Sequence, residues 1–337
     1  MPRKARIDAP GALHHIIVRG IERKDIFRDD RDKNNFVERL GRILLDTFTP
    51  CYAWALMSNH VHLLLRTGTA PVATVMRRLL TGYAQQFNRR HKRHGQLFQN
   101  RYKSILCEEE LYLLELVRYI HLNPIRVGLT KDLRQLRSYR YSGHAVLMGT
   151  LRYDWQDKDY VLRFFGTTDR EARKGYYSFV VKGIKQGRRP EIVGGGLIRS
   201  VGGWSVLKGL RLEGARVKGD ERILGSGDFV EKVLKQANEE FEQSTRLRNQ
   251  GLDLETVLSR VANYYEIDVD TLKTASKQPG ITKARSVVCY LAVRKLKVSG
   301  TAVARKLNIT PSAVSKAVIR GQSILNRTAI EKILIEC

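Results

Sequence analysis

The stretch YAWALMSNHVHLLLR, residues 52–66, consists of two short apolar runs on either side of Ser58-Asn59. Runs of this length, rich in aromatic and branched residues and bounded by turn-forming residues, are typical of β-strands. We therefore predict strands at 52–57 and 60–66, joined by a tight turn. Because alternate residues of a strand point to the same face, His60 and His62 project together while Val61 faces the other way.

Two neighbouring imidazoles can hold a divalent metal ion. In an arbitrary protein, however, two histidines on one strand are more often ordinary polar surface or a satisfied part of the core. The pair His60 and His62 therefore does not establish a metal site by itself, and the residues around it have to decide between these interpretations.

The residues around this hairpin alternate strand-like and helix-like patterns as far as about residue 150. Further strands are expected at 13–19 and 102–107, and helices at 32–48, 72–91 and 109–122. The last helix is expected to end at Asn123-Pro124, because proline cannot continue the hydrogen bonding of a helix. This alternation, with a hairpin in its middle, predicts an α+β fold with an antiparallel sheet.

Tyr119 and Asn123 lie four residues apart in this last stretch, so they share one helical face near its C-terminal end. A tyrosine beside a metal ion held by the histidine pair and the amide oxygen of Asn123 has the parts for phosphodiester transfer. The metal ion would polarise the scissile phosphate, and the phenolate would attack to leave a phosphotyrosine and a free 3′-hydroxyl. Ligands of this kind suit Mg²⁺ or Mn²⁺. The alternative for Asn123 is that it only caps the helix.

Charge is the most informative part of the composition. Against 34 Asp and Glu stand 60 Lys and Arg, which gives a formal net charge of +26 and a pI near 10.1. Such an excess concentrates polyanions at the surface, so nucleic acid is the expected partner, and a merely soluble basic surface is the alternative. No stretch approaches the roughly 18 apolar residues of a membrane helix, and no signal-peptide pattern follows the basic N-terminus. A cytoplasmic, nucleoid-associated location without a membrane partner is expected.

Residues 71–107 contain eight Lys and Arg, two histidines and no acidic residue. Their dense part, 86–94, is followed by Phe98 and Tyr102. Single strands are commonly held by guanidinium groups on phosphates together with aromatic rings near the bases; a solvated basic helix end is the alternative. The expected DNA contacts in this stretch are Arg89, Arg90, Lys92, Arg93, Arg101 and Lys103.

Four motifs, in this order, closely resemble the HUH single-tyrosine transposases, and in particular the REP-associated tyrosine transposases. They are GALHHIIVRG (11–20), MSNHVHLL (57–64), FNRR (87–90) with GQLFQNRYK (95–103), and YIHLNP (119–124). The resemblance spans about residues 8–150. It implies an HUH nuclease domain with a ferredoxin-like antiparallel sheet and helices.

Carried over residue by residue, the resemblance implies that His60 and His62 bind the metal ion and that Tyr119 is the nucleophile, which forms a 5′-phosphotyrosine. It also makes Asn123 the third metal ligand, since the family places a polar amide residue four positions after its tyrosine. On chemistry alone Tyr83 and Tyr102 compete with Tyr119, although each has an ordinary packing explanation. The register of the family motif selects Tyr119.

The amino-acid composition changes between residues 183 and 227, where 12 of the 27 glycines occur. Apolar residues persist in this stretch, so it is not a plain flexible linker. We interpret residues 151–227 as a connector that is glycine-rich from residue 183.

Residues 228–337 are expected to form a helical domain. Within it TAVARKLNITPSAVSKAVIR (301–320) divides into a short helix, a turn at 308–310 and a second helix opened by Pro311. This is the pattern of a helix-turn-helix. Its core side would be formed by Val303, Leu307, Val314 and Val318, with Ala304 where the two helices cross.

The segment from Val261 to residue 320 resembles, less strongly, the duplex-binding domain of the replication initiator DnaA. In that family the second helix enters the major groove, which implies DNA contacts from Ser312, Ser315, Lys316 and Arg320. The family's usual Asp-His-Thr-Thr is replaced here by TPSA at 310–313. Recognition of the initiator's own DNA boxes is therefore not implied.

These features predict a metal-dependent single-tyrosine transposase with parts at 1–150, 151–227 and 228–337. It would cut and rejoin single-stranded or hairpin repeat DNA, as a monomer or a homodimer, while the helical domain binds duplex DNA. One rival is a sequence-specific DNA-binding regulator with an inactive nuclease scaffold, against which the intact histidine pair and tyrosine argue. Another is a replication or conjugation initiator, but the sequence has no GxxxxGK[ST] phosphate loop.

Overall fold

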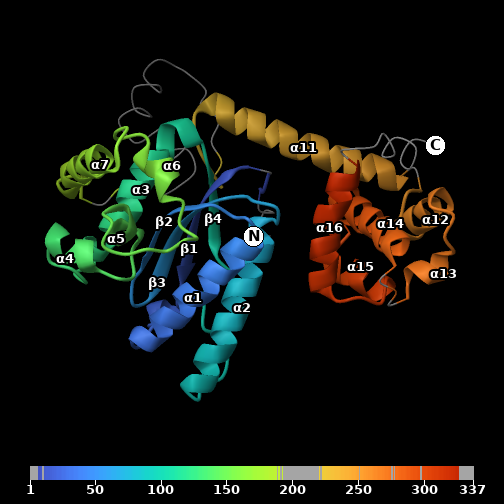
Figure 1. Cartoon of the computed structure of the whole chain (residues 1–337), viewed down its shortest axis with the longest axis horizontal. Coiled ribbons are helices and arrows are strands. Elements are labelled where there is room, and N and C mark those ends of the chain that lie inside the picture. Colours follow the sequence, from blue (N-terminus) through green and yellow to red (C-terminus); the bar gives the residue numbers. More distant parts are fainter. Residues whose placement is uncertain are drawn as a thin grey trace. The chain divides into compact units, whose positions relative to one another are not determined.

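A computed structural model of the 337-residue chain describes residues 7–9, 11–187, 189, 192, 220, 222–249, 251–274, 276, 278–296 and 298–325. The chain divides into two compact units, Met1–Lys232 and Val233–Cys337 (Figure 1). Each unit has a hydrophobic core of its own. The histidine pair and the candidate nucleophile all belong to the first unit.

The first unit is built on a five-stranded sheet with the order β2-β3-β1-β4-β5. Its strands are β1 (Leu13–Arg19), β2 (Cys51–Leu56), β3 (His60–Arg66), β4 (Lys103–Cys107) and β5 (Ile223–Leu224). Pairing among the first four strands is antiparallel. With helices α1 (Asp30–Asp46) and α2 (Val72–Arg90) they run β-α-β-β-α-β along the chain, the order of ferredoxin-like folds.

The complete sheet is mixed, whereas the sequence predicted an antiparallel one. Strand β5 pairs in parallel with β4 through Leu106↔Ile223 and Cys107↔Leu224. The prediction missed this strand because two residues are too few to show an alternation, and because the partner strand is remote in the sequence.

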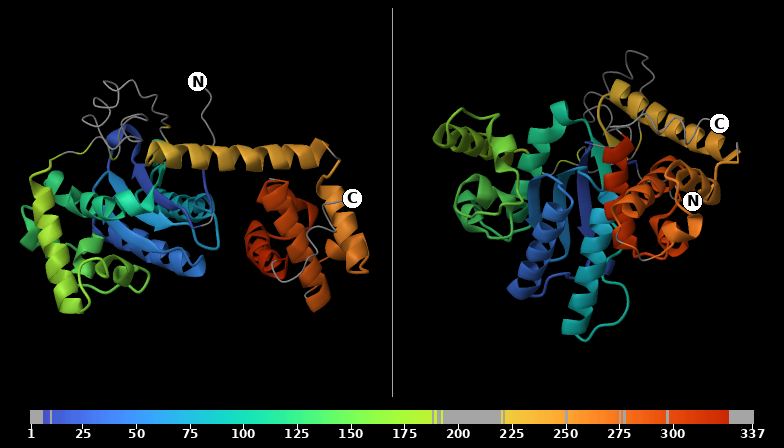
Figure 2. Two further views of the ribbon diagram at one scale, coloured as in Figure 1. Left: turned by 90° about the horizontal axis from the view of Figure 1, so that it is seen from above. Right: turned by 45° about the vertical axis from the view of Figure 1, so that its right-hand side comes forward.

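Alternation along the strands gives the sheet two apolar faces, and helices cover both (Figures 1 and 2). One face includes Ile16 and Leu63 and packs against α1 and α2. The other includes Leu64 and packs against α3 (Glu109–Arg126). Four further helices on that side are α4 (Leu133–Ser138), α5 (Gly143–Leu147), α6 (Lys158–Leu162) and α7 (Asp169–Ile184).

The first unit extends beyond the boundary predicted at residue 150. Val161, Tyr176 and Val180 are completely buried, at 0% exposure, in the core cluster on the α3 side. Residues 151–184 are therefore part of this unit's core and not of a connector. The glycine-rich stretch 183–227 lies for the most part outside the described residues.

Helix α3 continues past the point where the sequence predicted its end. It includes Asn123 and Pro124 and reaches Arg126. Proline has no N–H to donate to the carbonyl of Ile120, but the following residues still close the helix, since the N–H of Val127 donates to the carbonyl of Asn123 at 3.0 Å. Burial of Ile120 against the sheet favours the helical path. Asn123 is thus inside the helix and does not cap it.

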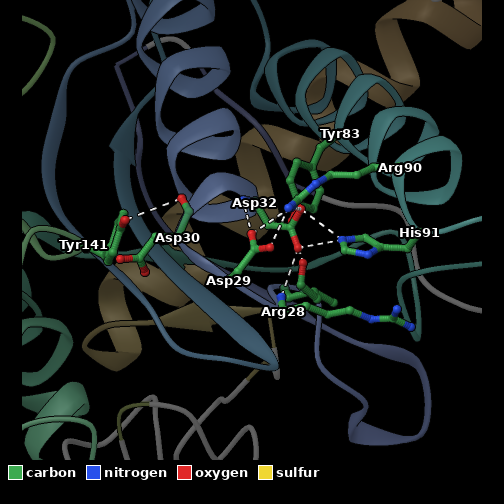
Figure 3. A network of polar contacts seen from close by, with 9 residues as sticks. Arg28, Asp29, Asp30, Asp32, Tyr83, Arg90, His91 and Tyr141 are labelled. Carbon is green, nitrogen blue, oxygen red and sulfur yellow. Dashed lines mark hydrogen bonds and ion pairs between the residues drawn. The ribbon is translucent and has the colours of Figure 1, made fainter.

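A polar network joins the start of α1 to the end of α2 (Figure 3). At its centre is Asp32, which is 3% exposed. Its carboxylate forms an ion pair with Arg90, contacts the imidazole of His91 at 2.9 Å and accepts the backbone N–H of Arg28 at 3.0 Å. Asp29 caps α1 and also pairs with Arg90. This network holds the two helices on the same face of the sheet.

The second unit is helical in its described part. Its elements are α11 (Gly227–Asn249), which begins just before the unit boundary, α12 (Leu254–Tyr264), α13 (Val269–Leu272), α14 (Pro279–Tyr290), a π-helical turn (Leu291–Lys295), α15 (Gly300–Lys306) and α16 (Pro311–Leu325). Four residues, among them Asn308 with a φ of 51°, join α15 to α16.

The residues predicted for the core of this helix pair are buried. Exposure is 0% for Val303 and Leu307, 2% for Val314 and 6% for Val318. Gly321 lies so close to α14 that a Cβ there would meet the carbonyl oxygen of Ser286. In the described part of the chain no helix is long and apolar enough to cross a membrane.

We expect Asp32→Ala to destabilise the first unit by about 2 kcal/mol, because it removes the buried carboxylate that accepts the N–H of Arg28 and leaves Arg90 paired with Asp29 alone. All three tryptophans precede residue 233, so tryptophan fluorescence during urea unfolding reports on this unit alone. The matched control is Asp30→Ala, since the Asp30 side chain is exposed and forms a surface ion pair with Lys33. Equal midpoints for the two variants would contradict the prediction.

Candidate active site

The histidine pair lies on the face of the sheet that α3 covers. The register pairs Arg19 with His60 and Ile17 with His62 across β1 and β3. Because side chains alternate, residues 13, 15, 17 and 19 of β1 and residues 60, 62 and 64 of β3 point to the same side, the side of Leu13 and Leu64. The structure therefore brings His60 and His62 under α3, as their spacing predicted.

Tyr119 projects from α3 onto these rings. Its ring centroid is 5.8 Å from that of His62 and 6.0 Å from that of His15, both in edge-on orientation. The rings of His60 and His62 are 5.3 Å apart. Tyr119 is half-buried. Three elements, β1, β3 and α3, thus place one tyrosine and three histidines in a single cluster.

His15 is a member of the cluster that the sequence analysis did not single out. Its Nε2 lies 2.9 Å from Nδ1 of His62, and the two rings stack at 5.1 Å. Exposure is 0% for His15 and 4% for His62. The alternation of the strand 13–19 was the available signal, but it needed the register of β1 on β3 to show which histidine faces His62.

Asn59 determines the orientation of the His60 ring. Its Nδ2 donates to the carbonyl of Arg23 at 3.0 Å, so its Oδ1 is the atom that faces Nδ1 of His60 at 2.6 Å. An amide oxygen only accepts, and Nδ1 of His60 therefore carries the proton. The other ring nitrogen, Nε2, keeps its lone pair. Metal-binding histidines are usually oriented in this way by a hydrogen bond from their second nitrogen.

Burial keeps the histidine pair neutral. Desolvation and the nearby charge of Arg19 lower the pKa of His60 to about 4. Desolvation, followed by the neighbouring His15 and His60, lowers the pKa of His62 well below its ordinary value. Neutral imidazole is the form that binds a metal ion, so both rings are ready to do so at neutral pH.

A divalent metal ion fits these residues, although the chain supplies few ligands. In the described part of the chain no three His, Cys, Asp or Glu side chains are grouped as a metal site. Ligands beyond His60 and His62 would therefore come from an amide, a substrate phosphate or water. Asn123 is 5% exposed, and its amide nitrogen is buried without a hydrogen-bond partner among the described residues. An amide nitrogen only donates, so the group that would satisfy it is an acceptor such as water or a phosphate oxygen.

Two arginines flank the cluster, and the sequence analysis named neither of them as a site residue. Arg19 is exposed at the end of β1, opposite His60. Arg126 is in the last turn of α3, with its guanidinium 5.0 Å from the ring centroid of Tyr119. Arg126 was missed because the predicted helix ended at residue 122, which left it without a defined face.

The two competing tyrosines lie on the other side of the sheet. Tyr83 and Tyr102 belong to the core cluster under α1 and α2, at 1% and 8% exposure. The hydroxyl of Tyr83 donates to the backbone carbonyl of Ile26. Both tyrosines thus have the packing roles that the sequence suggested, and neither faces the histidine pair.

Some residues of the basic stretch form ion pairs or hydrogen bonds within the protein, and others are exposed. Arg90 pairs with Asp29 and Asp32, and Arg93 donates to the amide oxygen of Asn88 and the carbonyl of Gln96. Exposed members of the predicted set are Arg89, Lys92, Arg101 and Lys103.

These residues lie on the loop between α2 and β4 and at its two ends, and this loop runs beside the end of β1. The N–H of Gln99 donates to the carbonyl of Arg19 at 2.9 Å, and Phe98 forms a bridge with Gly20. Lys103 is paired with Ile17, whose other neighbour in the sheet is His62. The exposed part of the basic stretch therefore leads to the end of the sheet where His60 lies.

In the second unit, Ser312, Lys316 and Arg320 are exposed on α16. They are spaced four residues apart, so they follow one face of that helix. Ser315 is half-buried, and its hydroxyl donates to the carbonyl of Pro311 at 3.1 Å.

Comparison with known protein families found a family model that matches part of the first unit. Residues 10–123 match the family model described as "Transposase IS200 like". The match includes His15, His60, His62 and Tyr119, which form the cluster described above, and it also includes Asn123. This part of the first unit is thus similar to the IS200-like transposases, which are a family of enzymes.

One solved structure is similar over part of the chain. It is described as "Structure of the REP associates tyrosine transposase bound to a REP hairpin", is 17% identical, and covers 46% of this chain and 91% of that chain with a TM-score of 0.37. No curated protein matches the chain.

The buried histidines predict that acid destabilises the first unit. Burial lowers the pKa of His60 to about 4 and of His144 to about 3, and it lowers the pKa of His62 and His121 as well. The unfolded chain binds protons at these imidazoles below about pH 6.5, whereas the folded chain does not until much lower pH. Stability is therefore full above pH 6.5 and decreases as the pH falls.

We expect the tryptophan-monitored melting temperature to fall steadily between pH 7 and pH 5, a window above the ordinary range of carboxylate titration. His94→Gln serves as the control, because His94 is exposed. A melting temperature that is equal at pH 7 and pH 5 would show that these histidines are not buried in the neutral form.

Proposed function

We propose that the first unit cleaves and rejoins DNA strands with Tyr119 as nucleophile, through a covalent 5′-phosphotyrosine. The observation that carries this proposal is the position of Tyr119 on α3, edge-on to His62 and His15 and inside a domain that matches IS200-like transposases. Beside Tyr119, desolvation keeps His60 and His62 neutral, and Nδ1 of each ring is hydrogen-bonded, to Asn59 and to His15 respectively.

The chemistry assigns one role to each of these residues. The phenolic oxygen of Tyr119 attacks phosphorus, the new P–O bond forms to tyrosine, and the bond from phosphorus to the 3′-oxygen breaks. The phenol gives up its proton and the departing 3′-oxygen takes one up, so that a free 3′-hydroxyl remains. Attack of a 3′-hydroxyl on the phosphotyrosine reverses these steps and rejoins a strand.

His60, His62 and Asn123 would hold a divalent metal ion. A bound Mg²⁺ or Mn²⁺ would supply positive charge that polarises the scissile phosphate. Asn59 fixes the His60 ring with Nε2 available, and His15 does the corresponding work for His62 by bonding to its Nδ1. Mixed nitrogen and oxygen ligands support these two metal ions over zinc.

We further propose that the substrate is single-stranded or hairpin DNA from repeat ends. The exposed cations Arg89, Lys92, Arg101 and Lys103 support this, because they lie on the loop between α2 and β4 and at its two ends, and this loop runs beside the end of β1. Arg90 and Arg93 are assigned to holding that loop and α2 in place. Phosphate contacts of this kind position a strand without selecting its sequence.

For the second unit we propose binding of duplex DNA through α16 as the recognition helix of a DnaA-like helix-turn-helix. The exposed face with Ser312, Lys316 and Arg320 supports this assignment, as do the short turn before Pro311 and the buried core of the helix pair. Such binding would add affinity or target choice, while the chemistry belongs to the first unit.

The reaction class is tested with Tyr119→Phe. We expect the unchanged protein, labelled hairpin DNA from its own genomic flanks and Mg²⁺ to give a protein–DNA adduct that survives denaturing gels. Tyr119→Phe should lower the amount of covalent protein–DNA adduct at least about a thousandfold, because the nucleophile is lost. The variant should still bind the hairpin DNA. Tyr177→Phe is the matched control, since Tyr177 is exposed on α7.

An adduct that persists in Tyr119→Phe would refute the assignment of the nucleophile. If no adduct forms with any metal ion while hairpin DNA binds, the regulator with an inactive nuclease scaffold becomes the better interpretation. An adduct that forms equally well in excess chelator would refute the role of the metal ion.

The role of α16 is tested with Lys316→Ala combined with Arg320→Ala. We expect a loss of about tenfold in duplex affinity and a reduced slope of affinity against salt, because two phosphate-binding cations are removed. Adduct formation on a short hairpin should stay unchanged. Lys273→Ala is the control, because Asp270 already neutralises Lys273. Equal duplex affinities for the two variants would place duplex binding elsewhere.

A further inference from the structure

Arg126 stands out among the arginines of the first unit by its position. It is half-buried in the last turn of α3, and its guanidinium lies 5.0 Å from the ring centroid of Tyr119. One of its Nη1 protons is donated to the backbone carbonyl of Tyr119 at 3.2 Å. Tyr119, Asn123 and Arg126 are spaced by four and three residues, so they share one helical face.

Within the described part of the chain, Arg126 forms no ion pair. Two neighbouring arginines, Arg118 and Arg189, share the carboxylate of Glu115. Desolvation is the main cause that lowers the pKa of Arg126; the neighbouring Tyr119 raises this pKa, and the charges of Arg189 and Arg118 lower it further. A half-buried cation without a counter-ion is unfavourable unless an anion joins it.

We propose that Arg126 is a catalytic residue that binds the non-bridging oxygens of the scissile phosphate, both when Tyr119 attacks and in the phosphotyrosine that results. This assignment rests on the proposed function of Tyr119. Attack adds negative charge to the oxygens on phosphorus, and a guanidinium held against the ring and the backbone of Tyr119 would stabilise that charge. The fork of donors suits phosphate, and only one donor is used by the carbonyl of Tyr119.

The competing explanation is structural. Basic side chains near the C-terminus of a helix often bond to its last carbonyl groups, and the contact with the carbonyl of Tyr119 is of that kind. A structural arginine would matter equally for every substrate. An arginine that binds phosphate would matter only where the phosphate carries its charge, and this difference separates the two explanations.

The test uses two forms of one hairpin DNA. The first has an ordinary phosphodiester at the scissile position, and the second has a neutral methylphosphonate at the same position. The scissile position is mapped from the product that the unchanged protein forms. Binding is measured in chelator, so that only cations of the chain act on the phosphate. The proteins are Tyr119→Phe and the same variant with Arg126→Gln, Arg126→Lys or, as matched control, Arg163→Gln. Arg163 also lies over a tyrosine ring, that of Tyr160, at 3.8 Å.

We expect Tyr119→Phe to bind the phosphodiester hairpin about tenfold more tightly than the methylphosphonate hairpin. With Arg126→Gln added, the preference for the phosphodiester hairpin should fall to less than about twofold. Arg126→Lys should retain part of this preference, and Arg163→Gln should retain all of it. In the otherwise unchanged protein, Arg126→Gln should slow adduct formation on the phosphodiester about a hundredfold.

A preference that survives Arg126→Gln would overturn the assignment, and so would equal losses of affinity on the two hairpins. Either result leaves the nucleophile intact, because Tyr119→Phe alone decides that question. Failure of the unchanged protein to form any adduct would refute the proposed function and this assignment with it. Tryptophan-monitored melting of Arg126→Gln establishes that the variant is folded.

Discussion

The register of β1 on β3 is the constraint on which the site depends. It places Ile17 opposite His62 and Arg19 opposite His60, so that three histidines face α3 together. A slip by one residue would move every side chain of a strand to the opposite face of the sheet. The core opposes such a slip, because Ile16 and Leu63 belong to the cluster on one face and Leu13 and Leu64 to the cluster on the other.

Helix α3 supplies the other half of the site, and its length determines what the site contains. A helix that ended before Asn123 would offer Tyr119 alone. Continuation through Pro124 to Arg126 adds an amide and a guanidinium on the same face. The helix is held against the sheet by Leu116 and Ile120, which are completely buried. Packing thus outweighs the one backbone hydrogen bond that proline removes.

The basic stretch shows how charge alone misleads about individual residues. Arg89 and Arg90 are neighbours in a run that reads as uniformly cationic, yet only Arg90 meets the carboxylates of Asp29 and Asp32. Sequence analysis assigned both arginines to DNA binding, because it cannot tell which cation pairs with a carboxylate far away in the chain. Arg90 and Asp29 are separated by 61 residues. Arg89 stays exposed and available.

Local patterns determined the strands, most helix boundaries and the pairing of His60 with His62 on one face, because these follow from a period of two or of 3.6 residues. They also determined the buried core of the α15–α16 pair. Only the tertiary structure decided that His15 completes the cluster, that β5 joins the sheet, and that residues 151–184 belong to the first unit's core. Each of these depends on contacts between residues far apart in the chain, for which a local pattern carries no signal.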